Sequence, residues 1–515
     1  MNHLSNEDYA KYLVKGSAIV FGSMVAAAVI GIILRILLAR ALSPEDYGLL
    51  FAVIAFVSFF TIFSHLGVRG ALTKFISEFR AEKKLDEIKS TILTGFGIMT
   101  VAAVLLSLTF IALSEFLSQS FFGTPSAKPV LIILAIWFVA TMTQNFLRST
   151  FQGFRDMVGH SGIRLARMIF TLGLVTIAIF LVDSGVVGIA LAYLFGSILS
   201  SLVFFVLLRR KHSQLLKGDG SISRSHAKKL LSFGLPLLLA GVSGTLIGWT
   251  DTLMLTEFRS LEGVGFYQVA RPLTQFLGYF GMAISIPFFP MVSEIWAKGE
   301  RKTLRSVLHL LVKFSVILII PAALVFLAFP GTVIRLLFGA KYLQATTALQ
   351  VLSVGTVFLV GSRIFGPVLT GTGRPRLYLK ASGGAAIFNV FANLILVPPY
   401  GAGGAAIATS ISLLIMLILC FYFVRGIIGF PVPIPDILKA LTGGGLVLLM
   451  VTGLKTIVVL PPWPAFFVVI VPSLLFYIVW ILRTGGVTRK DLNIVEKVTP
   501  IPRQLIKVVK RLTIK

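Results

Sequence analysis

The sequence predicts an all-α integral membrane protein of about fourteen transmembrane helices, built as two pseudo-symmetric six-helix lobes followed by two extra C-terminal helices. Three observations carry this prediction. Of the 515 residues, 56% are hydrophobic and 13% are charged, about half the charged share of a soluble domain. Apolar runs of roughly 20 residues, long enough to cross about 30 Å of hydrocarbon, recur along the chain. Several short motifs also return about 216 residues later.

The apolar runs set the order of the spanning helices. The first run is too long for the apolar core of a signal peptide, so we expect it to remain as an anchor. Ser43-Pro44 ends it, because proline disfavours helix in the residue before it. The expected spans are 16–41, 47–68, 91–114, 128–150, 162–183, 186–208, 231–255, 265–292, 309–329, 345–369, 378–398, 402–424, 438–459 and 465–482.

Positive charge orients these spans. The loops and tail on the N-terminal face collect roughly 38 of the 47 Lys and Arg, against about six in the opposite loops. We therefore expect both termini in the cytoplasm and the protein in the cell (plasma or inner) membrane. The net charge of +27 indicates contact with anionic lipids and no nucleic-acid partner. The loops counted on this face are 69–90, 148–167, 209–229, 298–313, 374–380 and 425–439.

An internal repeat organises the chain. Ser77-Glu78 returns as Ser293-Glu294, and the GIALA that begins at Gly188 returns as GAAIA at Gly404, since 404 minus 188 is 216. Six helices per repeat is an even number, so the two lobes are expected to be related by an axis along the membrane normal. The predicted parts are a cytoplasmic amphipathic start (1–15), an N-lobe (16–210), a basic linker (211–230), a C-lobe (231–426), helices thirteen and fourteen (437–482) and a basic tail (483–515).

Common enzyme chemistries find no pattern here. Cys420 is the single cysteine, and the six histidines lack metal-ligand spacing, so we expect no disulfide, no metal and no cofactor. No phosphate-binding loop of the form Gly-x-x-x-x-Gly-Lys-Ser/Thr occurs, which argues against ATP hydrolysis. We expect a protein without enzymatic activity.

Ionisable residues at membrane depth are costly and are therefore functional candidates. Four lie inside predicted spans: Arg35, Asp251, Arg271 and Arg363. Arg35 and Asp251 are repeat-equivalent, since 251 minus 35 is 216, so they could approach each other near the pseudo-twofold axis. For each arginine, a place in a wet cavity competes with snorkelling to the interface. For Asp251, a structural ion pair competes with a gating or coupling role.

Polar amides form a second group of candidates. Gln144, Asn145 and Asn389 could bind sugar hydroxyls, or could join helices by interhelical hydrogen bonds.

Five segments of the chain resemble a known family. They are LARALSPEDYGL, GFYQVA with PFFPMVSE, LFGAKYLQATTALQVL, TGTGRPRLYL and NLILVPPYGAGGAAIATSIS. Together they resemble the polysaccharide flippases of the multidrug/oligosaccharidyl-lipid/polysaccharide exporter superfamily. The resemblance implies a two-lobed bundle that moves lipid-pyrophosphate-linked oligosaccharides to the outer leaflet by alternating access.

This resemblance suggests roles for the candidates. A pyrophosphate crossing a low-dielectric layer needs fixed cations, and guanidinium groups match phosphate oxygens in charge and geometry. We therefore expect Arg35, Arg271 and Arg363 to bind substrate, and Asp251 to hold one of them when the cavity is empty. The expected partners are the lipid-linked oligosaccharide, membrane lipids, and glycosyltransferases or a polymerase of the same pathway.

Alternative functions remain open at this point. Multidrug exporters of the same superfamily often carry a carboxylate in the first helix, whereas Ser17 to Ala41 contains no Asp or Glu. The arginines also disfavour a cationic cargo, because like charges repel. A membrane glycosyltransferase would be expected to show paired carboxylates, and Glu115, Asp183 and Glu257 are dispersed. A major-facilitator carrier would show an Arg-rich Gly-and-Asp turn after the second helix, which is absent from the sequence.

Overall fold

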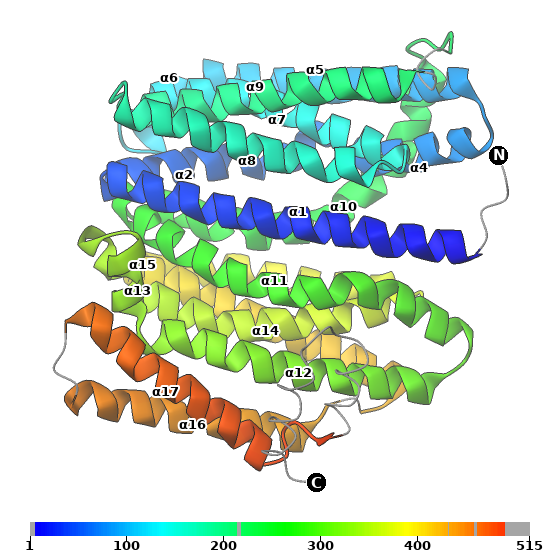
Figure 1. Ribbon diagram of the computed structural model, residues 1–515. Coiled ribbons are helices and arrows are strands. Elements are labelled where there is room, and N and C mark those ends of the chain that lie inside the picture. The colour runs from blue at the N-terminus through cyan, green and yellow to red at the C-terminus, as the bar shows by residue number, and fades with distance from the viewer. Residues whose placement is uncertain (1–5, 214–217, 431, 458–460, 490–515) are drawn as a thin grey trace. The chain divides into compact units, whose positions relative to one another are not determined.

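Helices joined by short turns make up the protein (Figure 1). The computed structural model describes residues 6–213, 218–430, 432–457 and 461–489, and contains no strand within them. Contact density divides the chain into two compact units. Unit 1 comprises Met1–Val269 and Ala385–Ala408, and unit 2 comprises Ala270–Gly384 and Thr409–Lys515.

Unit 1 holds the helices of the N-terminal half, together with the start of α11 (Leu261–Ala297) and the middle of α15 (Pro375–Ile428). Its other helices are α1 (Asn6–Ala41), α2 (Pro44–Phe59), α3 (Thr61–His65), α4 (Val68–Ala81), α5 (Leu85–Ala112), α6 (Ser114–Ser120), α7 (Ala127–Gly153), α8 (Met157–Phe180), α9 (Gly185–Lys211) and α10 (Arg224–Phe258).

Unit 2 holds the rest of α11 and α15 and the C-terminal helices. These are α12 (Arg301–Ala328), α13 (Pro330–Leu337), the 3₁₀ helix η2 (Ala340–Ala345), α14 (Thr346–Gly371), α16 (Ile434–Ile457) and α17 (Pro462–Arg483).

The chain is a multi-pass membrane protein. Twelve helices among the described residues are long and apolar enough to span a membrane, or thirteen if the bent α10 is one span. In α10 the two segments meet at 54° a few residues after Pro236, which removes a helical hydrogen bond. In α15 the backbone leaves the helical region at Gly401, after Pro398 and Pro399, so this 54-residue element is two helices. The total of fourteen stays a prediction.

The repeat is visible in the ends of the helices. α5 begins at Leu85 and α12 at Arg301, and they end at Ala112 and Ala328, so both differences are 216 residues. The short helices α6 and α13 begin at Ser114 and Pro330, again 216 residues apart. The two halves of the sequence therefore fold into the same succession of long and short helices.

One expected loop is a helix. Residues 69–90 were predicted to form a loop, and this is wrong for 69–81, which belong to α4. Apolar residues recur there every three or four positions, and this periodicity buries one face of a helix however many charges the other face carries. The buried residues of α4 are Val68, Ala71, Leu72, Phe75, Ile76 and Phe79.

The compact units do not follow the boundaries of the predicted lobes. α10, the first helix of the second repeat, packs against α2, α3, α4 and α5 within unit 1. The lobe boundaries at 210 and 231 therefore stay a prediction.

The basic linker between α9 and α10 is fastened to α5. Residues 214–217 lie outside the described residues, and the segment after them runs along the first turns of α5. Three of its backbone N–H groups donate to α5 side chains: Asp219 to Asp86 Oδ1 (2.6 Å), Ser221 to Ser90 Oγ (3.1 Å) and Ser223 to Thr94 Oγ1 (3.2 Å). The basic tail predicted at 483–515 lies outside the described residues from 490 onward.

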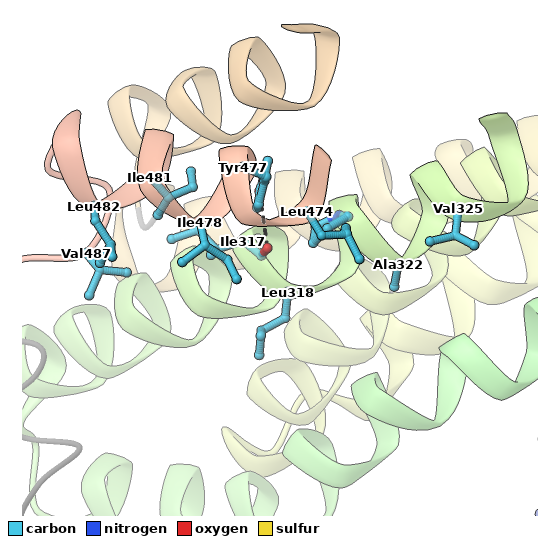
Figure 2. A pocket seen from close by; sticks show the side chains of 11 residues that line it. Ile317, Leu318, Ala322, Val325, Leu474, Tyr477, Ile478, Ile481, Leu482 and Val487 are labelled. Atoms are coloured by element: carbon cyan, nitrogen blue, oxygen red, sulfur yellow. Dashed lines mark hydrogen bonds between the residues drawn. The ribbon is translucent and has the colours of Figure 1, made fainter. Parts of the chain in front are cut away.

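The last two helices share an apolar core with α12 in unit 2. Tyr477 of α17 lies over α12, and its Oη donates to the carbonyl of Ile317 at 3.2 Å (Figure 2). Beside this contact lies a groove of about 430 Å³, lined by side chains such as Leu318, Ala322 and Ile478. Because its lining is almost entirely apolar, the groove is no candidate for binding a sugar or a phosphate.

Candidate functional site

Arg35 lies on α1, six residues before the helix ends at Ala41, or roughly 9 Å along its axis. The side chain is half-buried. Its Nη1 donates to the backbone carbonyl of Gln268 at 3.0 Å and to the Oε1 of the same residue at 3.3 Å. The guanidinium also lies over the Phe51 ring, with 4.1 Å between Cζ and the ring centroid. It therefore contacts protein groups inside unit 1.

Asp251 lies on α10 and is almost fully buried, with 1% of its surface exposed. Tyr267 Oη donates to Oδ2 at 2.5 Å. The amide of Asn393 donates to Oδ1 at 2.8 Å, and that of Asn389 lies 3.4 Å from the same oxygen. Several neutral donors thus hold this carboxylate, which is the arrangement that a buried charge requires.

Gln268 connects these two ionisable groups. Its side chain accepts from Arg35, and its Nε2 donates at 2.7 Å to Thr252 Oγ1, next along the chain from Asp251. The sequence suggested that Arg35 and Asp251 could approach each other, and both belong to one polar cluster of unit 1. We call this the α1–α10 cluster; its residues are Arg35, Tyr47, Phe51, Asp251, Thr252, Tyr267, Gln268, Asn389 and Asn393.

The partners of the two groups are themselves repeat-equivalent. Phe51 and Tyr267 are 216 residues apart, as are Arg35 and Asp251. In the first repeat the aromatic ring offers its electron-rich face to a cation. In the second repeat the added hydroxyl donates to an anion. One ancestral contact thus serves charges of opposite sign.

The other two predicted arginines lie in unit 2. Arg363 on α14 is half-buried, and its Nη1 donates to the carbonyl of Gly278 on α11 at 2.5 Å. Arg271, on α11, is also half-buried. Neither Arg35 nor Arg363 is ion-paired with a carboxylate among the described residues. Their positive charges are therefore held by neutral carbonyl groups.

The predicted amides separate by environment. Gln144 is 3% exposed, and its Nε2 donates to Ser197 O at 3.0 Å and to Ser200 Oγ at 2.7 Å. It therefore joins α7 to α9. Asn145 is half-buried on α7, and Asn389 belongs to the α1–α10 cluster.

The sequence reasoning missed a group of arginines. Arg148, Arg164 and Arg167 were counted as charges of the loop 148–167, although the predicted spans ending at 150 and starting at 162 include them. In the structure they lie within α7 and α8, both of which are long enough to span a membrane. Their place inside predicted spans was the signal that could have identified them.

Metal binding finds no support among the described residues, which contain no group of three His, Cys, Asp or Glu side chains placed to hold an ion. The charged and amide groups above are suited to binding, orientation and ion exchange.

The fold and these buried charges define a helical membrane transporter of the multidrug/oligosaccharidyl-lipid/polysaccharide exporter superfamily. Family models support this assignment: residues 13–296 match the model described as "Polysaccharide biosynthesis protein", and residues 236–395 match the MatE model. Because the first match covers more than half of the chain, the protein belongs to the polysaccharide biosynthesis protein family.

Individual relatives agree with this. The chain is 29% identical over 430 residues to the uncharacterized membrane protein MJ1068 of Methanocaldococcus jannaschii, covering 81% of this chain and 85% of that protein. It is 25% identical over 391 residues to the probable low-salt glycan biosynthesis flippase Agl15 of Haloferax volcanii, covering 76% and 79%. The solved structure of the lipid II flippase MurJ in an inward closed conformation is similar in fold, with a TM-score of 0.74, 17% identity and 89% and 97% coverage.

Proposed function

We propose that this protein is a flippase that moves lipid-(pyro)phosphate-linked oligosaccharides from the cytoplasmic to the outer leaflet, for cell-surface polysaccharide or glycoconjugate synthesis. Both termini lie in the cytoplasm, and the two repeats alternate access to the substrate. The membership of the polysaccharide biosynthesis family and the flippase name of the Haloferax relative support this proposal.

One structural observation carries the proposal. The guanidinium groups of Arg35 and Arg363 lie in spanning helices and are held by neutral carbonyls, so their charge is not cancelled. A positive site in a low-dielectric layer stabilises an anion and repels a cation. The phosphate of a lipid-linked saccharide is such an anion. Arg35, Arg271 and Arg363 are the residues assigned to bind it.

The sugar portion needs hydrogen-bonding groups instead of charge. Asn145 and Asn389 are assigned to this part of the substrate, together with Gln144 if its bonds to α9 exchange during transport.

Asp251 is assigned a gating or coupling role. Its carboxylate accepts from Tyr267 and Asn393, and Gln268 ties its neighbourhood to Arg35. A change in the charge of Asp251, through a proton or a monovalent cation, would alter the donors around it and the link to α1. Asp251→Asn should abolish dependence on an ion gradient while the folded protein persists. Unchanged gradient dependence in this variant would remove the assignment.

A cation-coupled multidrug exporter is the alternative, and the MatE match over residues 236–395 favours it. The first span, Ile19–Ala41, contains no Asp or Glu, and its ionisable groups are Arg35 and Arg40. This inventory suits an anionic cargo.

Reconstitution in vesicles decides between the two. A fluorescent polyprenyl-pyrophosphate saccharide on the outer leaflet becomes resistant to a membrane-impermeant quencher when it is flipped, and a cationic dye serves as the competing cargo. We expect leaflet exchange of the saccharide lipid alone. Arg35→Ala or Arg271→Ala should abolish that exchange with the protein still in the membrane. Exchange of the dye alone, or normal exchange in both variants, would contradict the proposal.

A further inference from the structure

Four arginines of unit 1 form a group outside the α1–α10 cluster. Arg69 begins α4, Arg148 lies near the end of α7, and Arg164 and Arg167 are three residues apart on one face of α8. α4 packs against α7, and α7 packs against α8. We call these four residues the arginine cluster.

The cluster is compact. The Arg148 guanidinium interacts electrostatically with Arg69, Arg164 and Arg167. Burial, and then the neighbouring Arg164, lower the pKa of Arg69, as expected for a cation held beside another cation away from water. His160 lies between them, with its Nδ1 3.0 Å from the carbonyl of Arg148.

The guanidinium groups lack acceptors. Each arginine carries five N–H donors, and all four side chains are half-buried. None of them donates a hydrogen bond or forms an ion pair with another described residue. The Nε atoms of Arg69 and Arg148 are fully buried and have no partner. Arg35 and Arg363, by contrast, each donate to a carbonyl.

The fold does not require this group of charges. At the corresponding positions of the second repeat, 364–366 are Ile, Phe and Gly, and 380–385 contain a single cation, Lys380. The same pair of helices is therefore built there without arginines. Four unpaired like charges at membrane depth are unfavourable unless an anion joins them.

We propose that Arg69, Arg148, Arg164 and Arg167 form a second anion site, which binds the phosphate or diphosphate ester of the lipid-linked substrate at the end of unit 1 where residues 154–156 join α7 to α8. This inference rests on the proposed function and adds residues that the sequence reasoning did not assign. Arg148 and Arg164 lie roughly 8–10 Å along their helices from that turn, on the face predicted to be cytoplasmic. The site therefore receives the head group on the side where a cytoplasmic pathway delivers it.

Binding measurements test the site. The full chain is placed in phosphatidylcholine nanodiscs, and the affinity for geranylgeranyl diphosphate is measured for the wild type and for the double variant Arg148→Gln with Arg164→Gln. The variant should bind about tenfold or more weakly, because charge-assisted bidentate contacts are lost. Arg210→Gln, an exposed cation at the end of α9, is the matched control and should bind like the wild type. Equal affinity in the double variant and the wild type would overturn the proposal.

Two competitors identify the source of the anion. Inorganic pyrophosphate should displace the lipid at higher concentration, because it shares the diphosphate; failure to compete would overturn head-group recognition, and tighter binding than the lipid would overturn the lipid source. Nanodiscs rich in phosphatidylglycerol should leave the affinity nearly unchanged. Loss of binding there would assign the cluster to bulk anionic lipid and overturn its assignment to the substrate.

Thermal unfolding separates a binding role from a structural one. Removal of two repelling charges should leave the melting temperature of the double variant equal or higher, whereas loss of a structural contact would lower it. A lowered melting temperature with unchanged affinity overturns the proposal. If the wild type flips the saccharide lipid and the double variant flips it equally well, this inference alone fails. If the wild type neither binds nor flips any polyprenyl diphosphate, the proposed function fails as well.

Discussion

The two repeats differ most in the segment that follows their first long helix. In the first repeat the chain forms α2, α3 and α4, with a sharp break where Leu66 and Gly67 adopt left-handed backbone angles (φ 45° and 71°). In the second repeat α11 runs unbroken over Leu261–Ala297, and positions 282 and 283 carry Met and Ala. Glycine adopts the left-handed region without a steric penalty, whereas alanine favours helix. Two adjacent residues thus decide whether one sequence pattern becomes one helix or three.

The break also allows a close approach. A Cβ at Gly67 would lie 1.8 Å from the carbonyl oxygen of Gly234 on α10. α3 and α4 both pack against α10 within unit 1. The left-handed turn therefore does more than end a helix, because it lets the first helix of the second repeat settle on the first repeat.

The largest expected effect comes from filling this turn. Gly67→Ala should destabilise the folded protein by about 3 kcal/mol, since it combines left-handed strain with overlap on the Gly234 backbone. The reciprocal change in α11, Ala283→Gly, should cost only about 0.5–1 kcal/mol through helix propensity. Thermal unfolding in detergent compares the two, and a Gly67→Ala protein as stable as the wild type would contradict this account of the break.

A second test separates the two repeat-equivalent charges. Tyr267→Phe removes the hydroxyl that donates to Asp251 and should cost about 1.5–3 kcal/mol, the range for a hydrogen bond to a charged group. The loss should be measured as a fall in stability together with a change in the ion-gradient dependence of transport. If transport keeps its gradient dependence while stability falls, the Tyr267 contact is structural only.

The turns before α8 and α15 offer a third comparison. Asp156 caps α8 by accepting from the Gly159 N–H at 3.0 Å, and it also binds Lys211 at 2.7 Å and His212 at 3.1 Å. Arg374 occupies the cap of α15 and makes no side-chain cap bond. Asp156→Ala should therefore cost about 1–2 kcal/mol, and Arg374→Ala close to nothing. Equal melting temperatures for the two variants would show that the cap contributes little.

The same carboxylate predicts a pH dependence. Burial acts to raise the pKa of Asp156, but its bonds from Gly159, Lys211 and His212 outweigh burial and lower that pKa below its ordinary value of 3.8. A lowered folded pKa means that the stabilisation is fully present above about pH 3.8 and is lost as pH falls through the folded pKa. Acid unfolding below pH 3.8 should be less steep in Asp156→Ala than in the wild type, and identical slopes would contradict this sign.

The smallest expected effect is on the cation side of the pair. Phe51→Leu keeps an apolar side chain but removes the ring face beneath Arg35, which should cost about 0.5–1 kcal/mol. The hydrogen bonds from Arg35 to Gln268 remain, so substrate affinity should change little. An effect on stability as large as that of Tyr267→Phe would show that the two partners do not differ in the way their chemistry predicts.

Local and tertiary information contributed differently to the candidate site. The repeat arithmetic identified Arg35 and Asp251 as an equivalent pair, because positions in a duplicated chain are countable. It could not identify Gln268 as the residue that connects them, since Gln268 is 233 residues from Arg35 and has no special position in the repeat. The arginine cluster was overlooked for a related reason: as loop charges, Arg148 and Arg164 satisfy the positive-inside pattern, and only the packing of α7 on α8 places them side by side.

The membrane class, the order of the long helices and the duplication are determined by the sequence itself, because each depends on the length, polarity or spacing of residues along the chain. Hydrocarbon thickness requires apolar runs of about 20 residues, and any folded arrangement must respect that length. The partners of the buried charges were decided only by tertiary structure. A guanidinium can donate to any carbonyl within reach, and which carbonyl is within reach depends on how helices far apart in sequence rotate and pack against one another.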